Sequence, residues 1–361
     1  MVKTALIHDH LVQDGGAEQV LKALGELYES APIFTLVADR DSSRRLFGDK
    51  RIITSFLQRI PLGVRRYQWW LFLMPAAIES HNLMDYDLVI SSASSFAKGV
   101  ITSSAAKHVC YCHTPTRYLW NDSHNYLKEL KVNRLIKRAL PLTLHKLRVW
   151  DRLAADRVDY FIANSRTVRD RIKKYYGRDS VVIYPPVAVD KFHLSDRPKK
   201  YFLAGGRLVP YKRFDLVVRA FSRLGVPVKI FGVGPEARYL QRQAKSNVEF
   251  LGRVSDAEKA ELYAGCLAYI NPQEEDFGIT AIEAMASGRP VIAYNRGGAT
   301  ETVIAGRTGE FFDEQIWEDL ADKVLRFRED QYDSQVIRRH SEQFSSENFK
   351  RNIADFISHL L

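Results

Sequence analysis

The sequence predicts an α/β protein with two Rossmann-like, doubly wound parallel-sheet domains that face each other across a cleft. The chain has 361 residues, about twice the ~100 to 200 residues of one domain. Short apolar runs alternate with longer amphipathic stretches, as they do where helices cover both faces of a parallel sheet. With 46% hydrophobic and 27% charged residues, the composition is that of a globular protein with a sizeable core.

The first alternating series predicts an N-terminal domain over residues 1–186. The runs TALIHDH, DLVISSA, HVCYCHT, DYFIANS and SVVIYPP are expected to form strands. We expect helices over residues 15–27, 127–158 and 167–176. Tyr184, Pro185 and Pro186 end the series, and the weak periodicity that follows predicts a hinge or linker at residues 187–198.

The second series predicts a C-terminal domain over residues 199–345. The runs YFLAGGR, PVKIFGVG, VEFLGRV, LAYINP and RPVIAYN are expected to form its strands. We expect helices over residues 214–224, 256–264 and 279–287. The apolar residues after residue 345 recur at helical spacing, which predicts a last helix within residues 346–361 that crosses back to the first domain.

Positive charge is concentrated in the N-terminal half of the chain. Residues 1–190 hold 28 Lys and Arg against 19 Asp and Glu, whereas the remaining residues hold 25 against 24. The first half therefore faces something anionic: a nucleic acid, an acidic membrane surface or a phosphorylated substrate. Three cysteines do not suggest a disulfide framework, and neither a secretory leader nor a membrane-spanning run is indicated. A cytoplasmic protein is expected.

Two glycine-containing loops follow strands and open helices. The first, at Asp14, Gly15, Gly16 and Glu18, lets backbone N–H groups approach an anion at a helix N-terminus, although a plain tight turn explains it about as well. The second runs from Gly205 to Arg213 and places Arg207 and Lys212 beside a glycine turn. Two fixed cations there suit a diphosphate, and a solvated basic turn is the competing interpretation.

The most specific motif is the stretch NPQEEDFGITAIEAMASGRPVIA, which begins at Asn271. It combines a strand end that delivers Glu275, a glycine loop that starts a helix, and Glu283 two turns further on. Backbone N–H groups at Phe277, Gly278 and Ile279 can hold a phosphate next to a sugar hydroxyl that Glu275 binds. Glu283 can accept hydrogen bonds from a ribose diol.

With these motifs in place, the sequence resembles glycosyltransferase family 4, the retaining enzymes of the GT-B fold. The resemblance spans nearly the whole chain, through the GGAE loop, the segment around His113, the Arg207 and Lys212 pair, and the two glutamates separated by seven residues. Within the family, HDHL followed by GGAE, ISSASSFAKGV and CHTPTRYLW are similar to O-antigen and capsule mannosyltransferases. Those enzymes generally use GDP-mannose and lipid-linked acceptors in surface polysaccharide biosynthesis.

The resemblance implies that residues 1–186 form the acceptor-side domain and that residues 199–345 form the nucleotide-sugar-binding domain. It also assigns a role to each candidate residue. In the C-terminal domain it implies that Glu275 contacts the transferred sugar, that Glu283 grips the nucleotide ribose, and that Arg207 and Lys212 bind the diphosphate. The catalytic set implied is His113, Glu275, Arg207 and Lys212. The remaining donor contacts expected are Gly15, Gly16, Phe277, Gly278 and Ile279, and the expected acceptor contacts are Glu18, Arg117 and Trp120.

No cofactor or metal ion is expected, because Arg207 and Lys212 already supply the positive charge that a divalent cation would bring. The pair Asp85 and Asp87 has the spacing of metal-binding aspartates, but it precedes a predicted strand instead of following it. His8 and His10 share one face of the first strand without a further ligand cluster.

Cations beside aromatic residues predict contact with an anionic membrane surface. Arg65 and Arg66 lead into an apolar run that contains Trp69 and Trp70, a combination that suits a membrane interface. The alternative is that these segments pack on the sheet and expose only their polar faces. We expect a peripheral protein on the inner face of the cell membrane.

Two other functions remain open from the sequence. A nucleotide-sugar epimerase of GT-B shape could share the fold and much of the donor site, and it would release a sugar isomer without an acceptor. A nucleic-acid-binding protein is supported only by the basic charge, because no recognisable RNA- or DNA-binding module accompanies it. We therefore expect no nucleic acid partner.

Overall fold

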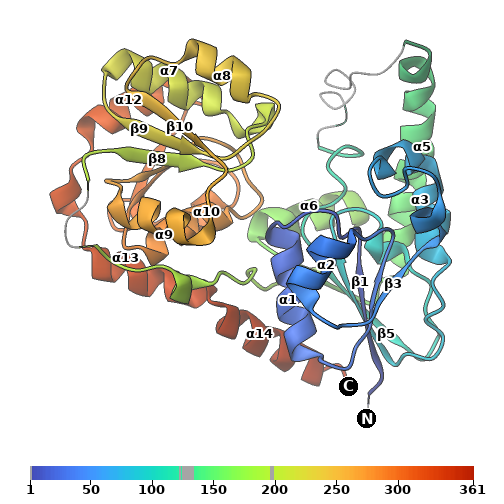
Figure 1. Cartoon of the computed structure of the whole chain (residues 1–361). Helices are drawn as coiled ribbons and strands as arrows, with labels where there is room; N and C mark the ends of the chain where they lie inside the picture. Colours follow the sequence, from blue (N-terminus) through green and yellow to red (C-terminus); the bar gives the residue numbers. More distant parts are fainter. Residues whose placement is uncertain (1, 122, 124–133, 196–198) are drawn as a thin grey trace. The chain divides into compact units, whose positions relative to one another are not determined.

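The computed structural model describes residues 2–121, 123, 134–195 and 199–361, and it describes the side chains of the long helix α5 from residue 140 onward. The chain forms two compact units. The first contains Met1–Pro185 together with Phe349–Leu361, and the second contains Pro186–Asn348. Part of the expected hinge, residues 196–198, lies outside the described residues. Figure 1 shows the elements of both units.

The first unit is built on a seven-stranded parallel sheet with the strand order β3-β2-β1-β4-β5-β6-β7. The order runs outward in both directions from β1 and β4, which is the doubly wound arrangement. Its strands are β1 (Thr4–His8), β2 (Ile33–Thr35), β3 (Ile52–Thr54), β4 (Leu88–Ala93), β5 (Lys107–Cys112), β6 (Tyr160–Ala163) and β7 (Ser180–Val182).

Helices cover both faces of this sheet, as buried parallel strands require. On β1, Leu6 points to one face, where it packs with α1 and the last helix, while Ala5 and Ile7 point to the opposite face with α3 and α6. Figure 1 shows α1 and α3 on opposite sides of the sheet. The helices are α1 (Gly16–Leu27), α2 (Arg40–Phe47), α3 (Met74–Glu79), α5 (Arg134–Asp156), α6 (Arg166–Tyr176) and α14 (Ser346–Ser358).

The second unit has a six-stranded parallel sheet with the order β10-β9-β8-β11-β12-β13. Its strands are β8 (Phe202–Gly205), β9 (Val228–Phe231), β10 (Val248–Gly252), β11 (Tyr269–Asn271), β12 (Val291–Tyr294) and β13 (Gly309–Phe312). Its helices are α7 (Phe214–Leu224), α8 (Ala237–Gln243), α9 (Asp256–Gly265), α10 (Ile279–Ala286), α11 (Ala299–Thr302), α12 (Trp317–Arg326) and α13 (Ser334–Ser341). The predicted fold class of two doubly wound parallel sheets is confirmed.

The topology determines where chemistry can occur in each unit. In the second sheet, β8 and β11 are neighbours at the point where the strand order reverses, and so are β1 and β4 in the first sheet. Ligands of doubly wound sheets bind beyond the carboxyl ends of the strands at such reversal points. The loops that follow β8 and β11, and those that follow β1, β4 and β5, therefore hold the residues to compare with the sequence predictions.

Candidate active site

The loops after β8 and β11 bring two predicted residues of the second unit into contact. The Lys212 ammonium, in the short turn before α7, forms an ion pair with Oε1 of Glu275, which follows β11. Each side chain is 14% exposed. A predicted phosphate-binding cation and a predicted sugar-binding carboxylate thus meet at one partly buried point, where low water content strengthens their interaction.

The backbone around Glu275 is fixed by contacts on both sides. The N–H of Gly298 donates to the Glu275 carbonyl at 2.8 Å. Gly278, the residue before α10, has a φ of +93°, and a Cβ there would lie 3.4 Å from Glu275 Oε2. Glycine suits this position because a positive φ strains other residues. The chain therefore turns into α10 directly beside the Glu275 carboxylate.

The start of α10 supplies backbone donors next to that carboxylate. Ile279 is its first residue, and the first N–H groups of an α-helix have no acceptor within the helix. The side chain of Phe277 is buried and packs edge-to-face on Phe344, with ring centroids 5.6 Å apart. A ligand could thus reach only the backbone of Phe277, and its predicted contact with a donor phosphate stays a prediction.

Glu283 is held in place by two neighbours on α9. Lys259 Nζ lies 2.9 Å from Oε1, and the Tyr263 hydroxyl donates to Oε2 at 3.0 Å. Tyr263 is buried, and burial together with the adjacent Glu283 charge raises its phenol pKa well above the usual value. The tyrosine thus remains a donor, and a carboxylate oxygen that accepts one bond can accept another.

Arg207 differs from Lys212 in its surroundings. Its side chain is exposed directly after β8, and among the described residues its guanidinium has no hydrogen bond or ion pair. The two cations predicted to act as a pair are therefore unequal, since Lys212 is held by a carboxylate and Arg207 is open to solvent.

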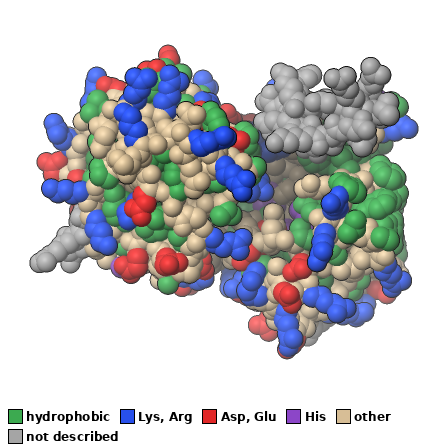
Figure 2. All heavy atoms as spheres, turned by 45° about the horizontal axis from the view of Figure 1, so that its top comes forward, with side chains coloured by type: hydrophobic (Ala, Val, Ile, Leu, Met, Phe, Trp, Pro, Cys, Tyr) green, Lys and Arg blue, Asp and Glu red, His purple; other side chains and the backbone are tan. Residues whose placement is uncertain are grey.

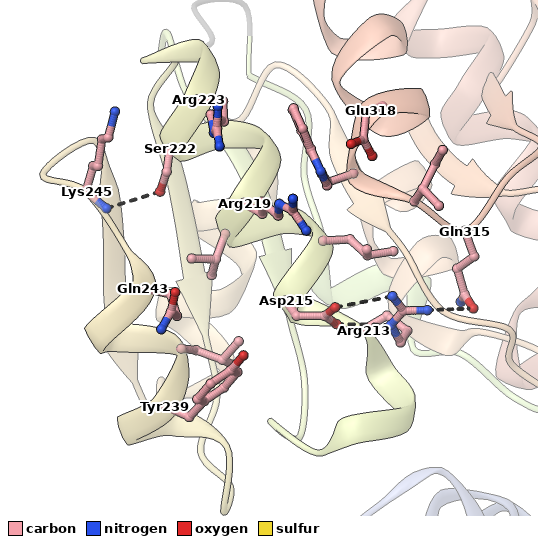
Figure 3. A pocket seen from close by; sticks show the side chains of 15 residues that line it. Arg213, Asp215, Arg219, Ser222, Arg223, Tyr239, Gln243, Lys245, Gln315 and Glu318 are labelled. Atoms are coloured by element: carbon pink, nitrogen blue, oxygen red, sulfur yellow. Dashed lines mark hydrogen bonds and ion pairs between the residues drawn. The ribbon is translucent and has the colours of Figure 1, made fainter.

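A separate cavity of about 520 Å³ lies among α7, α8 and the start of α12 (Figure 3). Its lining does not include the predicted donor-binding residues. Arg213 crosses it, pairing with Asp215 and donating to Gln315 at 3.1 Å. Gln315 in turn donates to the Pro272 carbonyl at 3.0 Å. This cavity wall therefore supports the loop that carries Glu275.

In the first unit, His113 follows β5 and is linked to β1 through β4. Its Nε2 lies 2.8 Å from the Ser92 hydroxyl, which lies 3.2 Å from Nδ1 of His8. His8 Nε2 is 3.7 Å from Oε1 of Glu18. Four side chains from three strands and α1 thus form a continuous polar chain that ends at the predicted catalytic histidine.

The GGAE loop uses its own glutamate at the helix start. Glu18 Oε2 accepts the Gly15 N–H at 3.0 Å, as in a capping box. The Glu18 side chain is only 1% exposed. It is therefore placed to act on its neighbours in the protein, whereas its predicted contact with an acceptor stays a prediction. The same holds for donor contacts at Gly15 and Gly16.

Asp9 is a central residue of this loop cluster that the motifs did not single out. Its two carboxylate oxygens accept four backbone N–H groups, from Ser94, Ser95, Phe96 and Ala97, at 2.7 to 2.9 Å. Burial by itself raises the pKa of Asp9, but the neighbouring histidines and these N–H groups outweigh it and hold the pKa below its usual value. The HDH sequence after the first apolar run is the signal that could have identified it.

A buried hydrogen-bond network fixes the segment that follows His113. Asp151 on α5 accepts from Lys98, Thr116, Trp120 and Tyr176 at 2.5 to 2.8 Å. Trp120 also stacks on Tyr175 with centroids 5.1 Å apart. The indole N–H of Trp120 is thus used within the protein, so any contact with an acceptor must involve its ring. Arg117 is partly exposed in the same segment.

The residues predicted to meet a membrane fall into two groups. Arg65 and Arg66 are exposed, and Trp69 is 62% exposed with Arg66 lying 4.2 Å from its ring centroid. Trp70 instead packs against the core of the first unit. The turn at residues 67–73 directs neighbouring side chains to different sides, and membrane contact by Trp70 stays a prediction.

Further apolar side chains accompany Trp69 at the surface. Phe72 is 60% exposed and Leu62 is 52% exposed, and Leu62 has a φ of +61°, which is uncommon for a side chain of its size. Figure 2 shows hydrophobic side chains gathered on the flank of the first unit, with Lys and Arg side chains nearby. Helices within the described part of the chain are all too short or too polar to cross a membrane.

Potential metal ligands do not cluster in the described ranges: no group of three or more His, Cys, Asp or Glu there could hold an ion. Asp87 accepts a hydrogen bond from the Lys3 N–H at 2.8 Å. All three cysteines are buried free thiols.

Comparison with known families finds two matches that follow one another along the chain. Residues 14–191 match the model of "Glycosyltransferase Family 4". Residues 188–350 match that of "Glycosyl transferases group 1". Together the two models cover nearly all of both units.

Two curated relatives are each 30% identical to this chain. One is the D-rhamnosyltransferase WbpZ of Pseudomonas aeruginosa, matched over 192 residues, which are 48% of this chain and 49% of that protein. The other is the O-antigen chain mannosyltransferase C of Escherichia coli, matched over 189 residues, 48% of this chain and 50% of that protein. The chain thus aligns with about half the length of each.

Among solved structures, Anabaena Alr3699/HepE in complex with UDP and glucose is similar over both units. The TM-score is 0.73 at 19% identity, covering 99% of this chain and 100% of that one. At this identity the likeness concerns the fold, and it confirms the predicted GT-B architecture.

Proposed function

We propose that the chain, which belongs to the family 4 and group 1 glycosyltransferases, transfers a hexosyl group to a lipid-linked saccharide acceptor. The favoured donor is GDP-mannose, which would supply a mannosyl group. We further propose that transfer retains the anomeric configuration and requires no metal ion. The product would enter surface polysaccharide biosynthesis. The identity of the donor rests on the HDHL, GGAE and CHTPTRYLW motifs and on the similarity to the mannosyl- and rhamnosyltransferase.

The observation that carries this proposal is the contact between Lys212 and Glu275 beside the start of α10. A donor diphosphate is a stronger partner for the ammonium than one carboxylate, because it offers two charges and several acceptor oxygens. When it binds, Lys212 can turn to the phosphates, and Glu275 then becomes available to the hydroxyls of the transferred sugar. The exposed Arg207 can bind the same phosphates without first losing a partner.

Glu283 is assigned to the ribose of the donor. Lys259 and Tyr263 fix the orientation of its carboxylate before the ligand arrives. A ribose diol donates two hydrogen bonds, which a carboxylate can accept side by side. Preorganisation of this kind lowers the cost of binding, because the side chain loses little freedom when the ligand binds.

Catalysis in this proposal depends on positioning and electrostatics. The leaving diphosphate would help to take the proton of the acceptor hydroxyl while the sugar is transferred on the face from which the diphosphate departs. Arg207, Lys212 and the first N–H groups of α10 would stabilise the charge that develops on the diphosphate. These two cations replace the charge of a metal ion, so transfer should persist in EDTA.

The first unit is proposed to bind the membrane as a peripheral protein on its cytoplasmic face. Arg65 and Arg66 can approach anionic headgroups, while Trp69, Phe72 and Leu62 can insert to a shallow depth. At the membrane surface the protein would reach its lipid-linked acceptor. The supporting observation is that Trp69, Phe72 and Leu62 are apolar yet exposed.

Nucleotide specificity is the experiment that tests the donor assignment. UDP-sugars are the main alternative, and HepE was crystallised with UDP and glucose. Thermal unfolding is measured with GDP, UDP, dTDP and GDP-mannose; a ligand at ~100 times its Kd stabilises the protein by ~2.7 kcal/mol. Stabilisation by GDP and GDP-mannose supports the proposal. Stabilisation by UDP alone would contradict the mannosyltransferase assignment.

A further inference from the structure

We propose that Glu18 is a positioning residue for His113, acting through His8 and Ser92 to determine which ring nitrogen of His113 carries the proton. The inference rests on the proposed function insofar as His113 acts on the donor sugar. It assigns to Glu18 a role within the first unit in place of a direct contact with the acceptor.

Glu18 carries a negative charge. Burial raises its pKa, but the adjacent His8 outweighs burial and holds the pKa below its usual value. Glu18 is therefore a carboxylate, which can only accept hydrogen bonds. Its Oε2 accepts the Gly15 N–H, while Oε1 is buried and has no hydrogen-bond partner among the described residues.

The His8 ring lies beside Glu18. Its Nε2 is 3.7 Å from Glu18 Oε1 and is a potential donor to this buried oxygen. The carboxylate favours a proton on that nitrogen, because an unprotonated Nε2 would set a lone pair against a negative charge. In the neutral imidazole, Nδ1 then carries the lone pair and accepts a hydrogen bond from Ser92, 3.2 Å away.

The hydrogen bond that Ser92 donates to His8 also determines which nitrogen of His113 is protonated. A serine hydroxyl has one hydrogen, so Ser92 cannot donate to both histidines at once. If it donates to His8, its oxygen must accept from His113 Nε2 at 2.8 Å. The proton of His113 is thus fixed on Nε2 and the lone pair on Nδ1. A sugar hydroxyl that faces Nδ1 meets an acceptor and not a donor.

The variant Glu18→Gln tests this chain of hydrogen bonds. Glutamine retains an oxygen for the Gly15 N–H, as capping boxes allow, and its NH₂ group then faces His8 Nε2. That nitrogen must become an acceptor, so every bond in the chain reverses and the proton of His113 moves to Nδ1. The measurement is long-range ¹H–¹⁵N NMR on protein labelled at histidine, with the His113 signals assigned from His113→Asn.

Glu258→Gln is the matched control. Glu258 makes the same capping-box contact with Ser255 at the start of α9, at an exposed position. Wild type and Glu258→Gln should show His113 protonated on Nε2, and Glu18→Gln should show it on Nδ1. A wild-type proton on Nδ1, or the same His113 tautomer in Glu18→Gln as in wild type, would overturn the proposal.

A second variant covers the case in which Glu18→Gln does not fold. Ser92→Ala removes the bridging hydroxyl, so the His113 signals should become an average of both tautomers, whereas unchanged signals would overturn the proposal.

In transfer assays, Glu18→Gln should lower kcat about 3- to 10-fold, the equivalent of one neutral hydrogen bond, with nucleotide affinity unchanged. A tautomer that responds as expected in a protein without transferase activity would contradict the proposed function and leave this inference standing.

Discussion

Lys212 on the turn before α7 is ion-paired with Glu275 in the loop after β11, although the two are 63 positions apart in the sequence. The pair forms because β8 and β11 are adjacent in the sheet, so the loops that follow them meet at one edge. The Glu275 carboxylate balances the lysine charge beside the glycine turn. The pair also means that donor binding must exchange one ionic contact for another.

The two glutamates should fail in different ways when they are changed. We expect Glu275→Ala to lower kcat ~100-fold or more, if its contact with the sugar strengthens as positive charge develops during transfer. Glu283→Ala should mainly weaken donor binding and raise KM, because ribose contacts are the same before and during the reaction. Steady-state kinetics with varied donor separates the two. An equal loss of thermal stability without this kinetic separation would indicate structural roles for both.

The two cations should contribute unequally to nucleotide binding. Replacing Arg207 by Ala should weaken nucleoside diphosphate binding by ~1.5 to 3 kcal/mol, the range for hydrogen bonds to charged groups. Lys212→Ala should cost less in net terms, because wild-type Lys212 must first leave Glu275. Calorimetric titration with the nucleotide measures both, and Arg219→Ala, in the separate cavity of Figure 3, is the control. Unchanged affinity in Arg207→Ala would rule out a diphosphate contact for this residue.

Asp9→Asn should destabilise the protein, because an amide has one oxygen for four backbone N–H groups. At pH 7 we expect a loss of about 1.5 to 3 kcal/mol in the free energy of unfolding. The pKa of Asp9 is lower in the folded state, so its stabilisation is fully present above the unfolded pKa of about 3.9 and is lost as the pH falls through the folded pKa. The difference between variant and wild type should therefore shrink in acid.

Urea unfolding at several pH values provides this comparison. Asp39→Asn is the matched control, since Asp39 caps α2 through one N–H at a partly exposed site, and its effect should be smaller. If Asp9→Asn is as stable as wild type at pH 7, the loop after β4 does not depend on Asp9.

Membrane binding should depend on Trp69 and not on Trp70. Trp69→Ala combined with Phe72→Ala should reduce flotation with anionic vesicles, because both side chains are exposed. Trp70→Ala should instead lower thermal stability, since Trp70 packs against the core. Leu325→Ala, equally exposed on α12 of the second unit, is the control. Flotation that is absent in wild type, or unaltered by the double substitution, would leave these side chains without a membrane role.

The fold was predictable where the periodicity was long and unbroken. The expected helix at residues 214–224 matches α7, and the predicted runs contain β1, β4, β5 and β8. The expectation missed the strands β2, β3 and β13, each of three or four residues, although it found β8, which is also four residues long. The period of so short a run cannot by itself distinguish a strand from other buried segments. The helices α2, α3, α8, α11, α12 and α13 were also missed.

The candidate site was predictable only for residues that belong to local motifs. Glu275, Gly278 and Glu283 lie within one continuous stretch of sequence. Asp9 and Asp151 act through partners that are distant in the sequence, Asp9 on residues 94–97 and Asp151 on Lys98. The local sequence HDH could have drawn attention to Asp9, but the partners of Asp9 and Asp151 become neighbours only when strands pair and cannot be identified from local composition.

The proposed function is tested most directly by sugar transfer from labelled GDP-mannose to lipid-extractable saccharide, with purified protein, membranes supplying the acceptor, and EDTA in the buffer. We expect labelled product with wild type, retention of the anomeric configuration, and ~100-fold less product with Glu275→Ala. Labelled UDP-glucose in a parallel reaction should give far less. Transfer from UDP-glucose alone, transfer that requires added manganese or magnesium, or full activity of Glu275→Ala would contradict the proposed function.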